Sequence, residues 1–272
     1  MKFEEIRDQV LGVPFITVSS ARSLYNLIIE EKPKNILELG IAHGTATCYM
    51  AAALHEIGGG RIVSVDLESA NYEPSCEEQL SRTGLDQFVE IHRTKTGYTW
   101  FLHDEIVRNT VNDICVPKYD LCIIDGPKNW NIDGFSFFLV DKLLNEDGWI
   151  IFDDYGWTYE MSDKLRDVTD GVTHRHLSQA ELETPHIREV FELLVKQHGS
   201  YSKFIVQPIN DWAIAQKCKS ERKTYTVEYR KEKKDTYATI EDWVMRAGRW
   251  LYFRRFKNGQ FARREPFTKK PD

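Results

Sequence analysis

The chain has 272 residues, of which 42% are hydrophobic, and a formal net charge of −6. This length suits one sizeable α/β domain with a small appendage, or two small domains. The sequence contains no apolar run of the ~18–20 residues that a membrane span needs, and residues 1–7 lack the hydrophobic core of a signal peptide. We therefore expect a cytoplasmic protein.

Apolar and helix-prone segments alternate along the first 152 residues. Two helices are expected first, over residues 1–12 and 20–31, and Ser19 or Ser20 is the expected N-cap of the second. The five strands expected next cover residues 36–39, 61–65, 88–92, 119–124 and 148–152. The helices expected between them cover residues 45–56, 74–83, 98–110 and 134–145. This alternation, with apolar central strands, predicts a parallel sheet with helices on both faces.

The order of elements changes after the fifth strand. Residues 160–198 are helix-prone, with apolar residues at helical spacing. Two further strands, 201–207 and 212–216, are joined by only four residues, which predicts an antiparallel hairpin. The predicted fold class is therefore α/β, a Rossmann-like doubly wound sheet of seven strands that ends in an antiparallel hairpin.

The first strand runs into a turn of small residues. The sequence Glu-Leu-Gly-Ile-Ala-His-Gly at residues 38–44 leads directly into the helix-prone stretch 45–56. Small residues let a ligand approach the backbone, and the start of a helix offers free N–H groups. In an α/β protein this turn is where a nucleotide-like cofactor binds. The spacing differs from the dinucleotide fingerprint, which needs glycine at Ala42 and at Thr45.

Acidic side chains follow three of the predicted strands. Asp66 ends the second strand, where a carboxylate can accept hydrogen bonds from ribose hydroxyls. Asp125 ends the fourth strand, and the pair Asp153 and Asp154 ends the fifth. Because parallel strands end at one edge of a sheet, the last three carboxylates are brought together, where they would repel without a cation. A hard divalent cation with oxygen ligands fits such a group; the alternatives are solvated strand ends and an ordinary loop turn.

The glycine turn resembles the first motif of the class I S-adenosylmethionine-dependent methyltransferases. The resemblance implies that Gly40, Ala42 and Gly44 line the turn beside the methionine part of the cofactor, and that Glu38 helps to place the amino-acid moiety. It also implies that the ribose binds to Asp66. The residue that this family places beside the adenine follows the third strand, and Thr96 is the candidate here.

The acidic residues resemble those of the metal-dependent O-methyltransferases of the catechol, caffeoyl-CoA and macrolide-sugar types. That pattern has an Asp at the end of the fourth strand, matched by Asp125, and an acidic pair after the fifth, matched by Asp153 and Asp154. Catechol-type enzymes carry a lysine base three residues after the first Asp, and Lys128 has this offset. Many bacterial relatives have histidine there, so the chain departs from that subgroup. Asp125 is also a cofactor candidate, because other methyltransferases of the class use an acid there for the cofactor.

A compositional boundary lies near Cys218. Residues 1–216 carry a charge of −15, and residues 217–272 carry +9 with many aromatic side chains. We expect a methyltransferase domain over 1–216, with N-terminal cap helices over 1–31, and a basic, aromatic-rich C-terminal extension over 217–272. The extension could pack on the acidic domain or on a second subunit, which the composition favours. It could instead lie on an anionic membrane or bind RNA; the negative main domain disfavours nucleic acid.

The five cysteines show no paired close spacing, which indicates reduced thiols and no zinc site. The expected function is the Mg²⁺-dependent transfer of a methyl group from S-adenosylmethionine to a hydroxyl of a small molecule, a phenol or a sugar. Another divalent cation could replace Mg²⁺, and a homo-oligomer is expected. Three alternatives stay open: a metal-independent class I methyltransferase acting on O, N or C, a non-catalytic cofactor-binding module, and a nicotinamide-dependent oxidoreductase, which the glycine spacing disfavours.

Overall fold

The computed structural model describes residues 1–161 and 177–219, which belong to the first of two compact units, Met1–Glu221. Residues 162–176, part of the helix-prone segment, lie outside the described residues. So do residues 220–272, which make up nearly all of the predicted C-terminal extension. None of the helices in the two described ranges has the length and apolar character that crossing a membrane requires.

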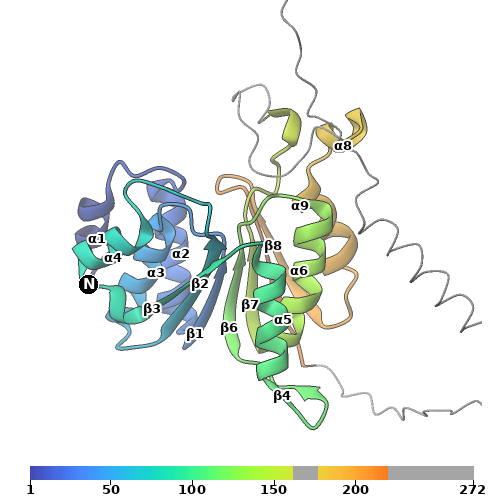
Figure 1. Ribbon diagram of the computed structural model, residues 1–272, viewed down its shortest axis with the longest axis horizontal. Coiled ribbons are helices and arrows are strands. Elements are labelled where there is room, and N and C mark those ends of the chain that lie inside the picture. Colours follow the sequence, from blue (N-terminus) through green and yellow to red (C-terminus); the bar gives the residue numbers. More distant parts are fainter. Residues whose placement is uncertain (162–176, 220–272) are drawn as a thin grey trace, which may run out of the picture. The chain divides into compact units, whose positions relative to one another are not determined.

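Seven strands form one mixed sheet in the order β3-β2-β1-β6-β7-β9-β8 (Figure 1). Five of them are parallel, and β9 pairs antiparallel with both β7 and β8. This arrangement confirms the predicted fold class, including the terminal hairpin. The strands are β1 (Asn35–Leu39), β2 (Arg61–Leu67), β3 (Val89–Thr94), β6 (Tyr119–Ile124), β7 (Leu144–Phe152), β8 (Tyr201–Gln207) and β9 (Trp212–Lys217).

Helices cover both faces of this sheet, as Figure 1 shows. The helices of one layer are α1 (Phe3–Val10), α2 (Val18–Glu31), α3 (Thr45–Glu56) and α4 (Cys76–Thr83). The other layer contains α5 (Tyr98–Arg108), α6 (Trp130–Leu143), α9 (His186–Glu189) and the π-helical turn η3 (Val190–Val195) that continues α9. The remaining short helices are η1 (Asp86–Phe88), a 3₁₀ turn before β3, and α8 (Gln179–Glu183).

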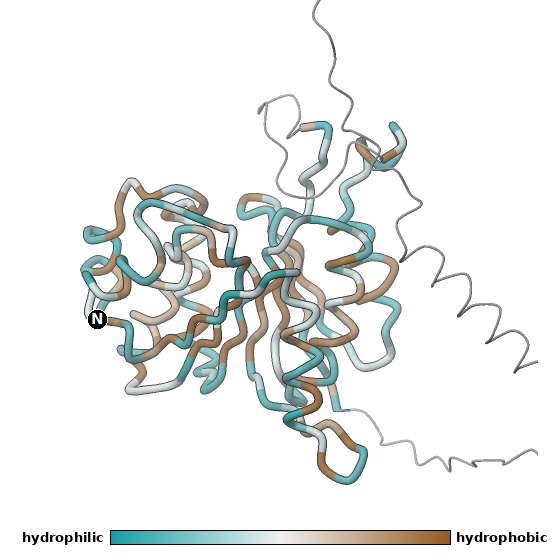
Figure 2. The backbone as a smooth tube through the Cα atoms, viewed as in Figure 1, coloured by the Kyte–Doolittle hydropathy of each residue, from teal (hydrophilic) through white to brown (hydrophobic). Residues whose placement is uncertain are grey.

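The core consists of two apolar layers, one on each face of the sheet. Successive strand residues point to opposite faces, so Ile36 packs towards α1–α4 whereas Leu37 packs towards α5, α6 and α9. The same alternation holds for Ile123 and Ile124 on β6. The strands therefore carry apolar residues on both faces, and Figure 2 shows hydrophobic colouring along them. Polar residues accumulate where the strands end, and the candidate site lies there.

The structure differs from the predicted elements at several boundaries. Helix α2 begins two residues earlier than expected, and its N-cap is Thr17, whose hydroxyl accepts the Ser20 N–H at 3.0 Å. Residues 144–145 belong to β7 and not to the preceding helix. A short hairpin, β4 (Thr110–Val111) and β5 (Ile114–Cys115), was not predicted. Its strands have two residues each, too few to show a periodicity, and Asn112 and Asp113 form its turn with positive φ angles.

Candidate active site

The carboxyl ends of β2, β1, β6 and β7 meet at one edge of the sheet. The Gly40 N–H donates to the Val65 carbonyl at 2.9 Å, and the Asp125 N–H donates to the Leu39 carbonyl at 2.8 Å. The Asp153 N–H continues this series to the Ile124 carbonyl at 3.1 Å. These bonds extend the strand pairing past the ends of the strands. The glycine turn therefore lies between Asp66 on one side and Asp125 and Asp153 on the other. The parallel sheet predicts this arrangement.

The glycine turn depends on residues without a Cβ at two points. Gly40 has φ +102°, and a Cβ built on it would lie 2.0 Å from the Asp125 carbonyl oxygen. Gly44 has φ +75°, and its Cβ would lie 2.3 Å from the Cys76 Sγ. Ala42 between them also has a positive φ, of 50°. The turn is therefore held in a conformation that leaves its backbone close to both neighbouring chain segments.

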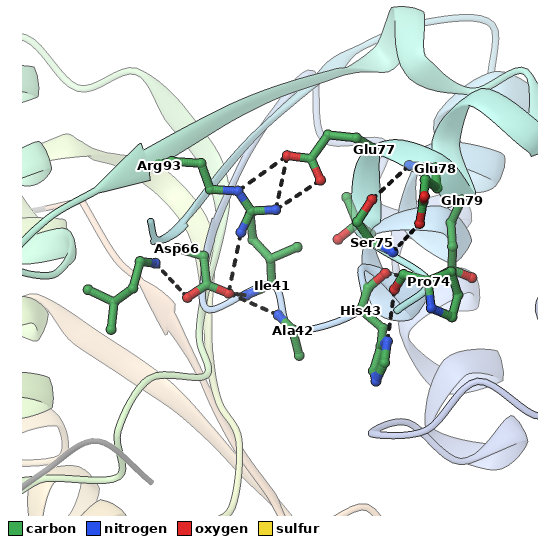
Figure 3. A network of polar contacts seen from close by, with 12 residues as sticks. Ile41, Ala42, His43, Asp66, Pro74, Ser75, Glu77, Glu78, Gln79 and Arg93 are labelled. Carbon is green, nitrogen blue, oxygen red and sulfur yellow. Dashed lines mark hydrogen bonds and ion pairs between the residues drawn. The ribbon is translucent and has the colours of Figure 1, made fainter. Parts of the chain in front are cut away.

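Asp66 is bonded to the backbone of this turn. Its Oδ2 accepts the N–H groups of Ile41 and Ala42, each at 3.0 Å, and its Oδ1 accepts the Leu67 N–H at 2.7 Å (Figure 3). A carboxylate oxygen has two lone pairs, so Oδ1 keeps capacity for one further hydrogen bond. The ribose interaction stays a prediction, and this geometry favours one hydroxyl over the expected two.

Glu38 is buried on the central strand β1. Its Oε2 accepts hydrogen bonds from the Ser64 hydroxyl at 2.6 Å and the Thr47 hydroxyl at 2.8 Å. Burial raises the pKa of Glu38 to about 8, against these two hydrogen bonds, and the like charges of Asp125 and Asp66 raise it further. Near neutral pH this carboxyl is thus mainly protonated, and a cation placed beside it would favour its ionised form.

A cavity of about 160 Å³ joins Glu38 to the acids at the ends of β6 and β7. Its lining combines polar and apolar side chains. The polar lining residues are Thr17, Ser20, Glu38, Asp125, Asp153, Asp154 and Asn210. The apolar ones are Phe15, Ile16, Leu24, Ala46, Ile123, Ile151 and Trp212. The cavity therefore brings together the predicted Glu38 and all three predicted metal ligands.

Asp125, Asp153 and Asp154 form a compact acidic cluster. One carboxylate oxygen from each lies within 4.8 Å of the other two. Burial raises the pKa of Asp153 well above its usual value, and the neighbouring carboxylates Asp125 and Asp154 add to this. Three close oxygens from acidic residues form a donor set that suits Mg²⁺ or another hard cation, which can hold the remaining positions with water and substrate oxygens.

The predicted base Lys128 contacts this cluster directly. Its Nζ lies 2.8 Å from the Asp125 Oδ1 and 3.1 Å from the Asp154 Oδ2. Lys128 and Asp154 both have positive φ angles, of 58° and 59°, a conformation that costs free energy and is common at functional sites. Burial lowers the pKa of Lys128, but Asp125 and Asp154 outweigh it, so this pKa lies well above its usual value. Lys128 becomes a base only when another cation offsets these carboxylates.

A second polar network, which the sequence did not indicate, holds the loop that carries Lys128. Asp133 is fully buried on α6 and accepts hydrogen bonds from the Tyr98 hydroxyl and, at 2.6 Å, from the Asn129 N–H. The Asn129 side chain in turn caps α6 by accepting the N–H groups of its first turn. A Cβ on Gly126 would lie 1.9 Å from the Tyr98 hydroxyl oxygen. The backbone on both sides of Lys128 is therefore fixed.

Several residues named from the sequence lie outside the cavity. Thr96 is exposed in the loop between β3 and α5 and does not line the cavity. Aromatic residues just after β7 also pack away from the cavity: Tyr155 donates to Glu192, and Tyr159 is buried against Trp157 and His186. Near the start of α2, Thr17 and Ser20 line the cavity, whereas Val18 and Ser19 between them are exposed and do not.

Asn210 and Arg93 are two further residues of the site that sequence reasoning missed. Asn210 lies in the β8–β9 turn and accepts a hydrogen bond from the Ser20 hydroxyl of α2 at 3.2 Å. No local signal could have indicated this contact, because 190 residues separate the two side chains. Arg93 pairs in register with Asp66 across β3 and β2. Aligning the ends of these two predicted strands could have found it.

Comparisons with known proteins agree with this architecture. Residues 37–155 match the family described as a methyltransferase domain, whereas no curated protein matches the sequence. An O-methyltransferase from Bacillus cereus in complex with S-adenosylhomocysteine aligns with a TM-score of 0.54 at 20% identity, covering 80% of this chain and 90% of that one. An O-methyltransferase of tomaymycin synthesis from Streptomyces achromogenes, in complex with S-adenosylmethionine, aligns with a TM-score of 0.52 at 16% identity, covering 80% and 89%.

A methyltransferase from Podospora anserina bound to S-adenosylhomocysteine is a third similar structure. It aligns with a TM-score of 0.53 at 15% identity, covering 80% of this chain and 87% of that one. At these identities the structural likeness concerns the fold, and the matched family concerns the segment from β1 to the residues just after β7. Together they confirm the expected resemblance: the chain has the fold of the class I methyltransferases, and its residues 37–155 are similar to a methyltransferase domain.

Proposed function

We propose that this protein transfers a methyl group from S-adenosylmethionine to a hydroxyl of a small molecule, with the help of a divalent cation such as Mg²⁺. One observation carries the proposal. One cavity has the buried Glu38 of the glycine-turn strand among its lining residues, together with three clustered carboxylates, two of which contact Lys128. A methyl donor and a metal-bound acceptor could thus meet in one space.

The residues present fit both groups. The turn at residues 40–44 has positive φ angles at Gly40, Ala42 and Gly44, and a backbone with such small residues at these positions lets a cofactor approach it closely. S-adenosylmethionine supplies a methyl group on a sulfonium. Three carboxylate oxygens within 4.8 Å of one another suit a hard cation, and such a cation makes a hydroxyl that contacts it more acidic.

The chain's own groups then have separate tasks. Asp125, Asp153 and Asp154 would hold the cation, and Lys128 would take the proton from the acceptor hydroxyl at its Nζ. The apolar lining residues, including Leu24, Ile151 and Trp212, would keep water away from the reacting atoms. Orientation provides much of the rate in an in-line displacement, because the reactants are held in line before they react. The two similar structures described as O-methyltransferases support the choice of oxygen as the acceptor atom.

The test combines cofactor binding with metal dependence. We expect calorimetry to detect binding of S-adenosylhomocysteine, and we expect turnover on a panel of catechols and sugars to stop in EDTA and return with added Mg²⁺. Absence of S-adenosylhomocysteine binding would overturn the proposal as a whole. Full activity in EDTA would overturn only its metal part.

A metal-independent methyltransferase is the second candidate. The observation that favours it is the bridge from Lys128 to Asp125 and Asp154, since an ammonium group can neutralise the acidic cluster in place of a metal ion. In that case Lys128 would stay protonated and would orient the acceptor without removing its proton. The EDTA experiment separates the two candidates, because only the metal-dependent enzyme loses turnover.

A further inference from the structure

Arg93 is the cation at the opposite end of the candidate site from Lys128. It lies on β3, in register with Asp66 on β2, so the two side chains project from the same face of the sheet. Its NH1 atom lies 4.0 Å from the Asp66 Oδ2. The proposed function assigns no role to Arg93, although it adjoins the carboxylate that is expected to contact the ribose.

Glu77 in the first turn of α4 holds the other side of the guanidinium (Figure 3). The Arg93 NH2 donates to both Glu77 carboxylate oxygens at 3.0 Å, and its Nε donates to one of them at 3.2 Å. Forked contacts of this kind fix the guanidinium plane as well as its position. Arg93 therefore connects the start of α4 to the end of β2.

The third nitrogen of the guanidinium, NH1, takes no part in the contacts with Glu77. NH1 is buried and has no hydrogen-bond partner among the described residues. Buried donors in proteins are nearly always paired, so one that is not calls for an explanation. An ion pair at 4.0 Å joins NH1 to the Asp66 Oδ2, which already accepts two N–H groups from the glycine turn. The NH1 charge thus acts on Asp66 from just outside hydrogen-bond distance.

Asp66 needs such a counter-charge because the candidate site is rich in acids. Asp66 and Asp125 both act on Glu38 and disfavour its ionised form. A positive charge in register with Asp66 offsets this repulsion when Glu38 ionises, and it favours one orientation of the Asp66 carboxylate. In that orientation Oδ2 is occupied by the turn, and Oδ1 keeps one free lone pair.

We infer that Arg93 is a positioning residue of the cofactor site. Held by Glu77, it fixes Asp66 so that Oδ1 accepts the hydrogen of one ribose hydroxyl of a nucleoside cofactor; this rests on the proposed function. Arg93 acts through Asp66 and not by changing the acid cluster. A purely structural role, in which Arg93 only ties α4 to the sheet, predicts a different response to changes in the ribose.

The experiment compares S-adenosylhomocysteine with its 2′-deoxy and 3′-deoxy analogues by calorimetry. In the native protein, we expect loss of the hydroxyl that contacts Asp66 to weaken binding about tenfold, as for a hydrogen bond to a charged group. Arg93→Met should weaken S-adenosylhomocysteine binding by a similar factor. It should leave the affinity for the analogue without that hydroxyl within about twofold of the native value.

The matched control is Arg61→Met. Arg61 also connects β2 to β3, through an ion pair with Glu90 at 2.7 Å, but at the far end of these strands. We expect this variant to bind all three ligands like the native protein. Equal weakening of all three ligands by Arg93→Met would overturn the inference and support the structural role.

Glu77→Gln keeps the test decisive if Arg93→Met does not fold. Glu77 is half-exposed, so its substitution removes the charge that holds the guanidinium and leaves Arg93 in place. The inference expects a smaller, several-fold loss of affinity with the same dependence on the ribose hydroxyl, and an equal loss for all three ligands overturns it. If the native protein binds none of the three ligands, the proposed function itself fails. If the native protein binds them and the variants lose affinity for all three equally, only the inference about Arg93 fails.

Discussion

The candidate site has acidic residues at two ends, Asp66 at the end of β2 and the acidic cluster after β6 and β7. The surroundings of the carboxylates differ between these two ends. Asp66 accepts three backbone N–H groups, lies beside an arginine that Glu77 holds in place, and is 16% exposed. Asp125 and Asp154 are 34% and 33% exposed, and both contact the ammonium of Lys128. The Asp66 carboxylate thus has several fixed partners within the protein. The carboxylates of Asp125 and Asp154 have oxygens that solvent or a ligand can reach.

This difference matches two different tasks. A cofactor that binds in the same way in each cycle needs a fixed acceptor, which backbone donors provide at little entropic cost. An acceptor hydroxyl has to lose a proton, so the groups around it have to change partners during the reaction. Exposed carboxylates with a single flexible cation allow such exchange.

One substitution at each end, Asp153→Asn and Asp66→Asn, should separate turnover and metal binding from S-adenosylhomocysteine affinity. We call these two the crossed substitutions. We expect Asp153→Asn to lower turnover by at least about 10⁴-fold, because a cation contributes several kcal/mol of charge stabilisation. S-adenosylhomocysteine affinity should stay within about twofold. Asp66→Asn should instead weaken that affinity about 10- to 100-fold, with Mn²⁺ binding by electron paramagnetic resonance unchanged. If both variants lost both properties alike, the two ends would form one inseparable unit.

Glu38 lies between the two ends and should respond to both through pH. Its pKa rises from 4.5 in the unfolded chain to about 8 in the folded one, mainly through burial and then through Asp125 and Asp66. The folded chain thus binds this proton more tightly. The free energy of unfolding should fall as pH rises from about 4.5 to 8, and then level off. At 1.36 kcal/mol per pH unit, the upper limit of this loss is about 5 kcal/mol.

Glu38→Gln should remove this part of the pH dependence. We expect the variant to gain stability relative to the native chain as pH rises, by a few kcal/mol at pH 9 in urea titrations without cofactor. Glu105→Gln is the matched control. Glu105 is also buried, but Lys118, Tyr119 and Arg108 outweigh its burial and lower its pKa, so its loss should leave the alkaline decline in place. Parallel pH curves for native chain and Glu38→Gln would contradict the raised pKa.

The sequence predicted the sheet, its antiparallel end and the position of the acidic cluster, because these depend on periodicity and on which strand ends carry which residues. Glu38, Asp125, Lys128 and Asp153 are adjacent to strand ends, so a correct strand order brings them together. The supports of the site could not be predicted in this way. Asn210 reaches Ser20 across 190 residues, and the pairing of Asp133 with Tyr98 depends on how α5 packs on α6.

Gly40 lies between the two ends of the site: its N–H donates to the Val65 carbonyl of β2, and its Cα lies close to Asp125. A Cβ on this residue would lie 2.0 Å from the Asp125 carbonyl oxygen, and its φ of +102° disfavours any side chain. We expect Gly40→Ala to destabilise the fold by about 3 kcal/mol, from the strained conformation together with a backbone clash. It should also weaken both cofactor binding and metal binding, which the crossed substitutions do not do.

Gly84→Ala is the matched control for Gly40→Ala. Gly84 also has a positive φ, of +68°, but a Cβ there meets nothing within 4 Å. This control should cost about 1–2 kcal/mol from conformation alone, with unchanged binding of both ligands. Equal destabilisation by the two alanines, measured by chemical unfolding, would show that contact with Asp125 contributes nothing.

Lys128→Met should lower kcat by about 10²-fold, or ~2.7 kcal/mol, which is less than the loss expected for Asp153→Asn, because proton transfer is one of several contributions. Its S-adenosylhomocysteine affinity should not change. Mn²⁺ should bind more tightly, because Lys128 and the cation compete for Asp125 and Asp154. Lys118→Met is the control: it breaks a 2.8 Å ion pair with the buried Glu105 and should reduce stability without lowering kcat.

Weaker Mn²⁺ binding in Lys128→Met would mean that the lysine shapes the metal site and does not compete with the metal. The acid cluster would then be as fixed as Asp66, and the contrast between the two ends would disappear.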